Sequence, residues 1–508
     1  MRKGKYVNIL VFILSFGFVS GCFETLIGKS LIQDVLNIEF NSKYDLSYEK
    51  YKVASFMDRR YFHDTLENFL SDLNMSAKFG IDTLGKSFAG RDIYGVRWGR
   101  GDKKVLLWTQ MHGDEPTATQ AAADFLNYLR LAEEHDSFVN SLEDSVTFLL
   151  ILCLNPDGAV NFKRRNVQNV DINRDALKLE TPEAAILREA FERFNPNWCF
   201  NLHDQSPYYH STQTNEDVHF SFQAPPIDNT SSKTATLLLA ERAIGYLLSY
   251  SNIEVESKHL AKYPVRYTPD SFGEYFQSKG VPTVLIETGF KLDDPEKQWL
   301  RKQHFYLYQA LFQGIGFDEL EPGMEKLYNN LPECRIADHD VVIENIEIQV
   351  KGAFVRKDMG FRTVWWSCTP TLPLRPVSYL ATIADPFSLD SRRYFNGGFY
   401  KLRFPQEYHV PMDSIQELID RDIASLVKDG FLHFHVETPP DSCIISESTP
   451  LKINEPVNES FRVGHPVNFY LKHESDSKLD ILFYNGHLLK LEDIKPSIFN
   501  KLIYSNYE

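Results

Sequence analysis

The sequence predicts an α/β domain with a mixed, mostly parallel sheet flanked by helices, followed by a β-rich, sandwich-like domain. The chain has 508 residues, which exceeds the size at which a single hydrophobic core stops growing, so two domains are expected. Between residues 80 and 315, short apolar runs alternate with helical patterns, as in sheets whose parallel strands are joined by helices. Beyond residue 330, strand-like runs dominate.

Apolar runs predict the strands of the first domain, and helical patterns predict what joins them. The expected strands are residues 105–108, 146–152, 198–202 and 283–286. Helices are expected after Pro116 through residue 129, from Thr181-Pro182 through 194, at 237–248 and at 296–312. We place this domain at residues 40–325.

The second domain is predicted from runs that are typical of short strands. These runs are residues 341–350, 377–383, 399–404, 431–436 and 479–484. One helix is expected among them, capped by Asp413 and ending at Gly430. We place this domain at residues 330–508.

Residues 1–22 have the pattern of an export signal. Basic residues 1–5 precede an apolar run, residues 9–19, which is too short to span a bilayer. The run ends in Val-Ser-Gly-Cys22, which resembles a bacterial lipobox, so we expect an exported lipoprotein anchored in the membrane through a lipid on Cys22, facing the periplasm or the cell surface. The alternative is a simple signal peptide in which Cys22 is incidental. No later segment is long and apolar enough to span a membrane.

Composition excludes several classes of protein. The net charge is −15 and no cluster of Lys and Arg follows the first residues, which argues against nucleic acid as a partner. Without Cys22, five cysteines remain, an odd number with no paired short spacing, so neither a disulfide framework nor a cysteine zinc site is expected. Cys153 and Cys199 lie in or beside strand-like runs and are expected to be buried free thiols.

Polar residues at the ends of the predicted strands indicate a metal site. His112 and Glu115 lie between the first strand and the helix after Pro116, His203 follows the third strand, and Glu287 follows the fourth. The carboxyl ends of strands are where open α/β sheets bind ligands. Two His and one carboxylate leave zinc a position for water, whose pKa the metal lowers to about 7. A carboxylate such as Glu287 can then take the proton of that water as it attacks a carbonyl.

A third cluster follows the second strand. It contains Asn-Pro-Asp-Gly at 155–158, two arginines at 164 and 165, and Asp-Ile-Asn-Arg at 171–174. Guanidinium groups can stabilise an oxyanion and can bind a carboxylate through two hydrogen bonds. With three other loops converging on the same edge of the sheet, a functional role is favoured over solvated surface charge.

Together these motifs resemble those of the zinc metallocarboxypeptidases similar to carboxypeptidase A. The resemblance spans about residues 40 to 315, and the motifs follow the family's order: HxxE, NPDG, an Arg followed by DxNR, a lone His after a strand, and a Glu before Thr-Gly. The resemblance implies a carboxypeptidase-like fold with one zinc ion held by His112, Glu115 and His203. It also implies that Glu287 is the general base and acid.

The resemblance also implies which residues contact the substrate, and two of these positions have alternatives. Arg164 would polarise the scissile carbonyl, with Arg165 as an alternative. Asn173 and Arg174 would bind the terminal carboxylate of the substrate. The Tyr that caps the substrate in this family matches Tyr267 only approximately, and Tyr263 competes with it.

Two acidic residues beside the ligands depart from the family or lack an assigned role. Asp114 stands inside the HxxE motif, where animal digestive members carry Arg, so different substrate surroundings are expected. Asp204 follows His203 and is either a partner of a metal ligand or an ordinary exposed Asp.

The function expected from these residues is removal of the C-terminal residue from peptides with a free carboxylate. An alternative enzyme on the same scaffold is an amidase or deacylase that cleaves an N-acyl amino acid or a murein peptide. A third hypothesis is a binding module that has lost catalysis. The joint presence of ligands, base and arginines argues against it.

Overall fold

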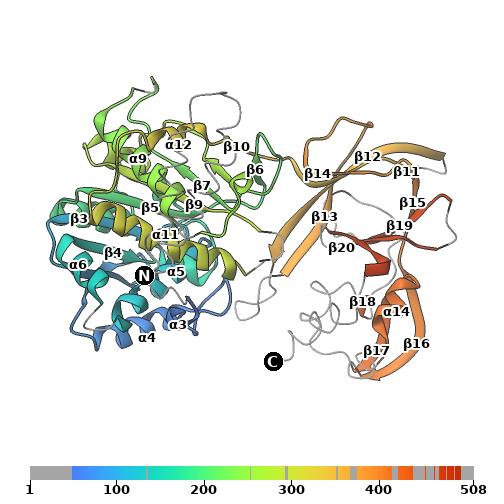
Figure 1. Cartoon of the computed structure of the whole chain (residues 1–508). Coiled ribbons are helices and arrows are strands. Elements are labelled where there is room, and N and C mark those ends of the chain that lie inside the picture. The colour runs from blue at the N-terminus through green and yellow to red at the C-terminus, as the bar shows by residue number, and fades with distance from the viewer. Residues whose placement is uncertain are drawn as a thin grey trace, which may run out of the picture. The chain divides into compact units, whose positions relative to one another are not determined.

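A computed structural model gives the architecture of the chain (Figure 1). It describes residues 48–132, 136–230, 232–251, 253–291, 294, 296–350, 353–366, 375–414, 421–438, 452–453, 463, 468–475, 478–484 and 487–493. The expected signal peptide, Cys22 included, lies outside these residues. None of the described helices has the length and apolar character needed to span a bilayer.

The chain divides into two units, residues 1–52 and residues 53–508. In the first unit the structure describes one short helix, α3 (Tyr48–Tyr51). The second unit contains both the α/β region and the β-rich region that the sequence predicts.

The α/β region is built on an eight-stranded sheet with the order β1-β2-β4-β3-β5-β9-β7-β8. Strands β3, β4, β5 and β9 pair in parallel, whereas β1, β2 and β7 pair antiparallel with their neighbours, apart from the parallel pair β7 and β8. The strands are β1 (Gly80–Lys86), β2 (Asp92–Gly99), β3 (Lys103–Thr109), β4 (Val146–Leu152), β5 (Trp198–Asp204), β7 (Phe220–Gln223), β8 (Leu260–Lys262) and β9 (Thr283–Thr288). The mixed, mostly parallel sheet is therefore confirmed.

Helices connect and cover these strands (Figure 1). They are α4 (His63–Asn74), α5 (Thr117–Leu131), α6 (Ser137–Ser145), α7 (Pro156–Val160), α8 (Pro182–Phe194), α9 (Ala235–Tyr250), α10 (Phe272–Ser278), α11 (Gln298–Gly316) and α12 (Glu325–Asn330). The start of α8 matches the sequence prediction, because the Thr181 hydroxyl accepts a hydrogen bond from the amide of Ala184 and Pro182 occupies the first turn.

The central strands are buried on both faces. On one face, Phe148 of β4 packs against Phe125 of α5 and Phe312 of α11. On the other face, Trp108 of β3 packs against Phe276 of α10 within a cluster that also includes residues of α8. Burial on both faces explains why these strands read as continuous apolar runs.

The β-rich region contains two sheets. The larger has the path β13-β12-β11-β15-β19-β20-β21, with β14 beside β11, and the smaller has the order β16-β17-β18. The strands are β11 (His339–Val350), β12 (Ala353–Trp366), β13 (Arg375–Ala384), β14 (Ser391–Asn396), β15 (Tyr400–Arg403), β16 (Gln406–Ser414), β17 (Phe431–Thr438), β18 (Lys452–Ile453), β19 (Phe469–His473), β20 (Ile481–Tyr484) and β21 (His487–Lys490). The β-rich prediction is confirmed, and the sandwich remains a prediction.

The helix expected from Asp413 to Gly430 begins later than predicted. Asp413 lies in β16, which pairs in parallel with β17. Helix α14 (Ile423–Lys428) is capped instead by Asp422, whose carboxylate accepts from the amide of Ser425. The predicted start was wrong. Asp413 and Asp422 are both residue types that can cap a helix, but Asp413 belongs to a paired strand and Asp422 is the cap.

Candidate metal centre

The register of the sheet places His203 beside Glu287. These residues are paired across the parallel strands β5 and β9, so their side chains leave the same face of the sheet. Both strands extend two residues beyond their predicted ends, so His203 and Glu287 lie in the last residues of the strands rather than in the loops that follow. Residues 110–116 connect β3 to α5 and bring His112 and Glu115 to the same edge.

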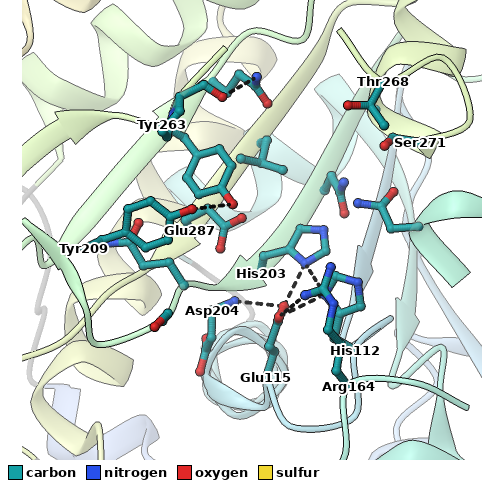
Figure 2. Close-up of a pocket in the computed structure, with 18 of the residues that line it drawn as sticks. His112, Glu115, Arg164, His203, Asp204, Tyr209, Tyr263, Thr268, Ser271 and Glu287 are labelled. Atoms are coloured by element: carbon teal, nitrogen blue, oxygen red, sulfur yellow. Dashed lines mark hydrogen bonds and ion pairs between the residues drawn. The ribbon is translucent and has the colours of Figure 1, made fainter. Parts of the chain in front are cut away.

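His112, Glu115 and His203 meet at one point (Figure 2). Nδ1 of His112 lies 2.9 Å from Oε1 of Glu115, and Nδ1 of His203 lies 2.7 Å from Oε2. The two Nδ1 atoms are 3.1 Å apart. All three side chains are buried, and their ligand atoms lie within 4.8 Å of one another.

The chemistry of this group fits zinc. Imidazole nitrogens and a carboxylate are the donors that zinc commonly takes in proteins, and three of them leave a position open. Although burial acts to raise it, the pKa of Glu115 is held well below its usual range by the neighbouring His112 and His203. Glu115 is therefore ionised, as a metal ligand must be.

Asp171 orients His112 from behind. Its Oδ1 lies 3.1 Å from Nε2 of His112, which leaves Nδ1 facing Glu115 and His203. Burial acts to raise the pKa of Asp171, but His112 and Arg164 lower it far more. Asp171 belongs to the DxNR motif but was assigned no role from the sequence, although its position shortly before the Asn-Arg pair was an available signal.

The NPDG motif holds the loop that carries His112. The side-chain amide of Asn155 donates to the carbonyls of Met111 and Arg164, and its oxygen accepts from the amide of Gly158. Gly113 packs directly on this turn, since a Cβ there would lie 2.0 Å from the carbonyl carbon of Gly158. The motif thus supports the site without lining it.

Glu287 is buried in the same cavity, which measures about 660 Å³. Burial and then the charge of Glu115 raise the pKa of Glu287 well above its usual range. A second row of lining side chains lies in register two positions before His203 and Glu287 on their strands: Asn201, Leu285 and Gln223. This row was not predicted from the sequence.

The two candidate arginines lie in different surroundings. Arg164 lines the cavity, with its guanidinium 3.2 Å from Glu115 and 3.1 Å from Asp171. The guanidinium of Arg165 donates instead to the carbonyl of Asn169 on the exposed side of the loop. The structure therefore brings Arg164, and not its alternative, to the site.

Asn173 and Arg174 line another wall of the cavity. The side-chain oxygen of Asn173 accepts from the amide of Phe272 at the start of α10. The guanidinium of Arg174 donates to the hydroxyl of Ser271, 2.8 Å away, and the side chain is exposed. Arg174 is therefore accessible to a ligand in the cavity, whereas Asn173 is largely buried and its side-chain oxygen is already hydrogen-bonded.

The candidate tyrosines separate in the same way. Tyr263 lines the cavity, and its hydroxyl lies 3.3 Å from that of Tyr209, which also lines it (Figure 2). Tyr267 is not among the residues that line the cavity. The structure thus places the competitor Tyr263 in the site, and Tyr209 was missed by the sequence analysis because nothing in its local pattern marks it.

The two acidic residues next to the ligands are both buried in large part. Asp114 lines the cavity, and burial followed by the charge of Glu115 raises its pKa to about 6. Asp204 is 5% exposed, which excludes the ordinary exposed Asp considered above, and its backbone amide donates to Glu115. Its carboxylate accepts from Thr117 and Lys297.

Comparison with known proteins agrees with the resemblance seen in the sequence. Residues 66–292 match the zinc carboxypeptidase family. Carboxypeptidase 2 of Trichophyton rubrum is 30% identical over 104 residues, which cover 20% of this chain and 19% of that protein. Carboxypeptidase M of Mus musculus is 27% identical over 142 residues, or 24% of this chain and 32% of that protein.

Among solved structures, a metallo-carboxypeptidase from Burkholderia cenocepacia aligns with a TM-score of 0.43 and 16% identity, over 52% of this chain and 70% of that one. The chain spans about a fifth of the length of the Trichophyton relatives that it matches. The family match thus covers residues 66–292, a little under half of the chain, and this region is similar to the zinc carboxypeptidase family.

Proposed function

We propose that this protein is a zinc metallocarboxypeptidase that hydrolyses the C-terminal peptide bond of peptides. The observation that carries the proposal is the convergence of His112, Glu115 and His203 in a cavity that also holds Glu287. Arginines line the same cavity, and the family match supports the assignment.

The three converging residues would hold one zinc ion. When bound there, zinc would supply Lewis acidity, which polarises a carbonyl and makes water a better nucleophile. The contact between Asp171 and His112 supports the assignment, because it directs Nδ1 of the imidazole toward the other two ligands.

Glu287 is the proposed general base and acid. Its carboxylate takes a proton from water as the water oxygen bonds to the scissile carbonyl carbon. The same carboxyl then gives the proton to the amide nitrogen as the C–N bond breaks, which releases a C-terminal amino acid and a shortened peptide. Burial supports this role, because it raises the pKa of the carboxyl of Glu287 and so favours uptake of a proton.

Positively charged side chains are proposed to bind the substrate. Arg164 stabilises the negative charge that develops on the carbonyl oxygen. Asn173 and Arg174 bind the terminal carboxylate, for which a guanidinium is well suited. Tyr263 replaces Tyr267 in our proposal as the residue that covers the substrate, because Tyr263 lines the cavity.

The test compares blocked dipeptides that end in a free carboxylate with the same dipeptides ending in an amide. We expect hydrolysis of the first set only, because the guanidinium of Arg174 is proposed to bind a terminal carboxylate, which the amidated dipeptides lack. Equal hydrolysis of both sets would contradict the carboxypeptidase proposal and favour the amidase or deacylase. Purified protein that binds no metal and cannot be reconstituted would favour a binding module.

We also propose that the protein is exported and anchored through a lipid on Cys22. The basic start, the short apolar run and the cysteine that follows small residues support this proposal. Substitution of Cys22 by Ala is expected to move the protein from the membrane fraction to the soluble exported fraction. If the variant and the wild-type protein have the same distribution between these fractions, the proposed lipid anchor is contradicted and the alternative of a simple signal peptide is favoured.

A further inference from the structure

Lys297 is a buried lysine beside the proposed metal centre. It immediately precedes α11, has a left-handed backbone with φ of 52°, and is 3% exposed. Its amide donates to the carbonyl of Asp294 and its carbonyl accepts from the amide of Arg301, so the backbone is held on both sides. A buried ammonium is costly unless charged or polar partners surround it. The residues that contact the ammonium of Lys297 therefore indicate its role.

The ammonium of Lys297 contacts two strand ends. It donates to Oδ2 of Asp204, 3.0 Å away, and to the carbonyl of Thr288, 3.2 Å away. Asp204 directly follows His203, and Thr288 directly follows Glu287. One cation thus links the ends of β5 and β9 at the positions next to a proposed ligand and the proposed base.

Asp204 also connects Lys297 to Glu115. Its Oδ2 also accepts from the hydroxyl of Thr117 at 2.6 Å, in the first turn of α5. Its backbone amide donates to Oε2 of Glu115 at 3.2 Å, the same oxygen that faces His203 (Figure 2). The guanidinium of Arg59 lies farther away, 3.8 Å from Asp204. Loss of Lys297 would leave the buried carboxylate of Asp204 with weaker compensation of its charge, in the residue whose backbone amide contacts Glu115.

We propose that Lys297 is a positioning residue, which acts through Asp204 to hold Glu115 and His203 in the arrangement that binds the metal. The inference rests on the proposed function, since it concerns the same metal centre. It goes further by assigning a role to a residue that follows the family match, which ends at residue 292.

The test uses Lys297→Met, which keeps the length of the side chain and removes its charge. We expect the affinity of the folded protein for Zn²⁺ to fall several-fold, which is less than the roughly 10- to 100-fold typical for a direct partner of a metal ligand, because Lys297 acts through Asp204. The affinity is measured on the full chain by competition with a chromophoric chelator. Lys302→Met is the matched control, because Lys302 lies on α11 and pairs with Glu254 at the surface.

A purely structural role would lower the melting temperature of the metal-free protein and leave the Zn²⁺ affinity of the folded protein unchanged. That outcome would overturn the inference. If Lys297→Met does not fold, Thr117→Val decides, since it removes one hydrogen bond to Asp204 with almost no change in volume. A several-fold weaker affinity supports the inference, and an affinity equal to that of the unchanged protein contradicts it. If the unchanged protein itself binds no Zn²⁺, the proposed function fails instead.

Discussion

At the scale of single residues, Arg164 and Arg165 show how the fold separates neighbours in the sequence. Both satisfy the motif, but only the guanidinium of Arg164 approaches Glu115 and Asp171. The difference arises because Arg165 lies on the outer side of the loop, where it bonds to Asn169. Sequence spacing alone could not make this choice.

Arg164→Ala is therefore expected to reduce kcat by about 10²- to 10³-fold, the usual effect of removing one donor to an oxyanion. Arg165→Ala is the matched control and should change kcat little. Steady-state kinetics with a blocked dipeptide measure both. Equal losses in the two variants, or a larger loss in Arg165→Ala, would contradict the assignment.

Glu287→Gln tests the proposed base at the same scale. The amide keeps the shape of the side chain but cannot accept the proton, so kcat should fall by about 10²- to 10⁴-fold or more. Zinc should be retained, because Glu287 is not one of the three converging ligand residues. The metal content of the purified variant is the control, and full activity with bound zinc would remove Glu287 from its role.

The sequence predicted much of the site because its charged residues follow strands that are easy to recognise. His112, Glu115, His203 and Glu287 were all expected at one edge, and the structure brings them together there. The choice of Tyr263 over Tyr267 and the contacts of Lys297 could not be predicted in this way. The side chains of Tyr263 and Lys297 reach the site from irregular segments, where no periodicity tells which way a residue points.

At the scale of elements, α11 is fastened to α5 by a fully buried ion pair. The guanidinium of Arg301 makes two contacts with the carboxylate of Asp124, at 2.7 and 2.5 Å. It also donates to the carbonyls of Val53 and Phe56. The pair thereby holds the start of residues 53–62 against both helices.

Arg301→Met should destabilise the protein by about 3 to 5 kcal/mol, because it removes the guanidinium that compensates the buried charge of Asp124. Arg193→Met is the control. Arg193 forms an exposed pair with Glu189 on α8, and its loss should cost about 0 to 1 kcal/mol. Urea unfolding followed by tryptophan fluorescence compares the variants. Similar midpoints for the two would contradict this reading of the buried pair.

His304 of α11 makes the fold sensitive to acid. Burial holds the pKa of its imidazole at about 3, whereas an unfolded histidine has a pKa of about 6.5. The unfolded chain therefore binds a proton first, and the contribution of His304 to stability is complete above about pH 6.5 and is lost as the pH falls toward 3. His304→Gln should flatten the decline of the urea midpoint between about pH 6.5 and 4. Parallel curves for the variant and the unchanged protein would contradict this expectation.

Element prediction succeeded where burial imposes one clear pattern. Strands β3, β4, β5 and β9 are buried on both faces and read as apolar runs. Strands β1, β2, β7 and β8 were missed. Their exposed or short segments carry mixed patterns, and their pairing depends on partners that lie elsewhere in the chain.

At the scale of the whole molecule, the crossover of the central strands explains why separate motifs form one site. Strands β3, β5 and β9 are neighbours in the sheet although β4 comes between β3 and β5 in the chain. Their carboxyl ends therefore meet, as in other open α/β sheets that bind ligands at this edge. The sequence predicted this fold class, but it gave no means of deriving the order of strands in the β-rich region, where the runs are short and similar.

The most direct test of the proposed function is digestion of a peptide library by the purified full chain, read by mass spectrometry. We predict that products lack only their C-terminal residue, that peptides ending in an amide remain intact, and that a chelator stops the reaction until Zn²⁺ is restored. Cleavage at internal bonds, equal cleavage of amidated peptides, or activity that survives complete removal of metal would contradict it.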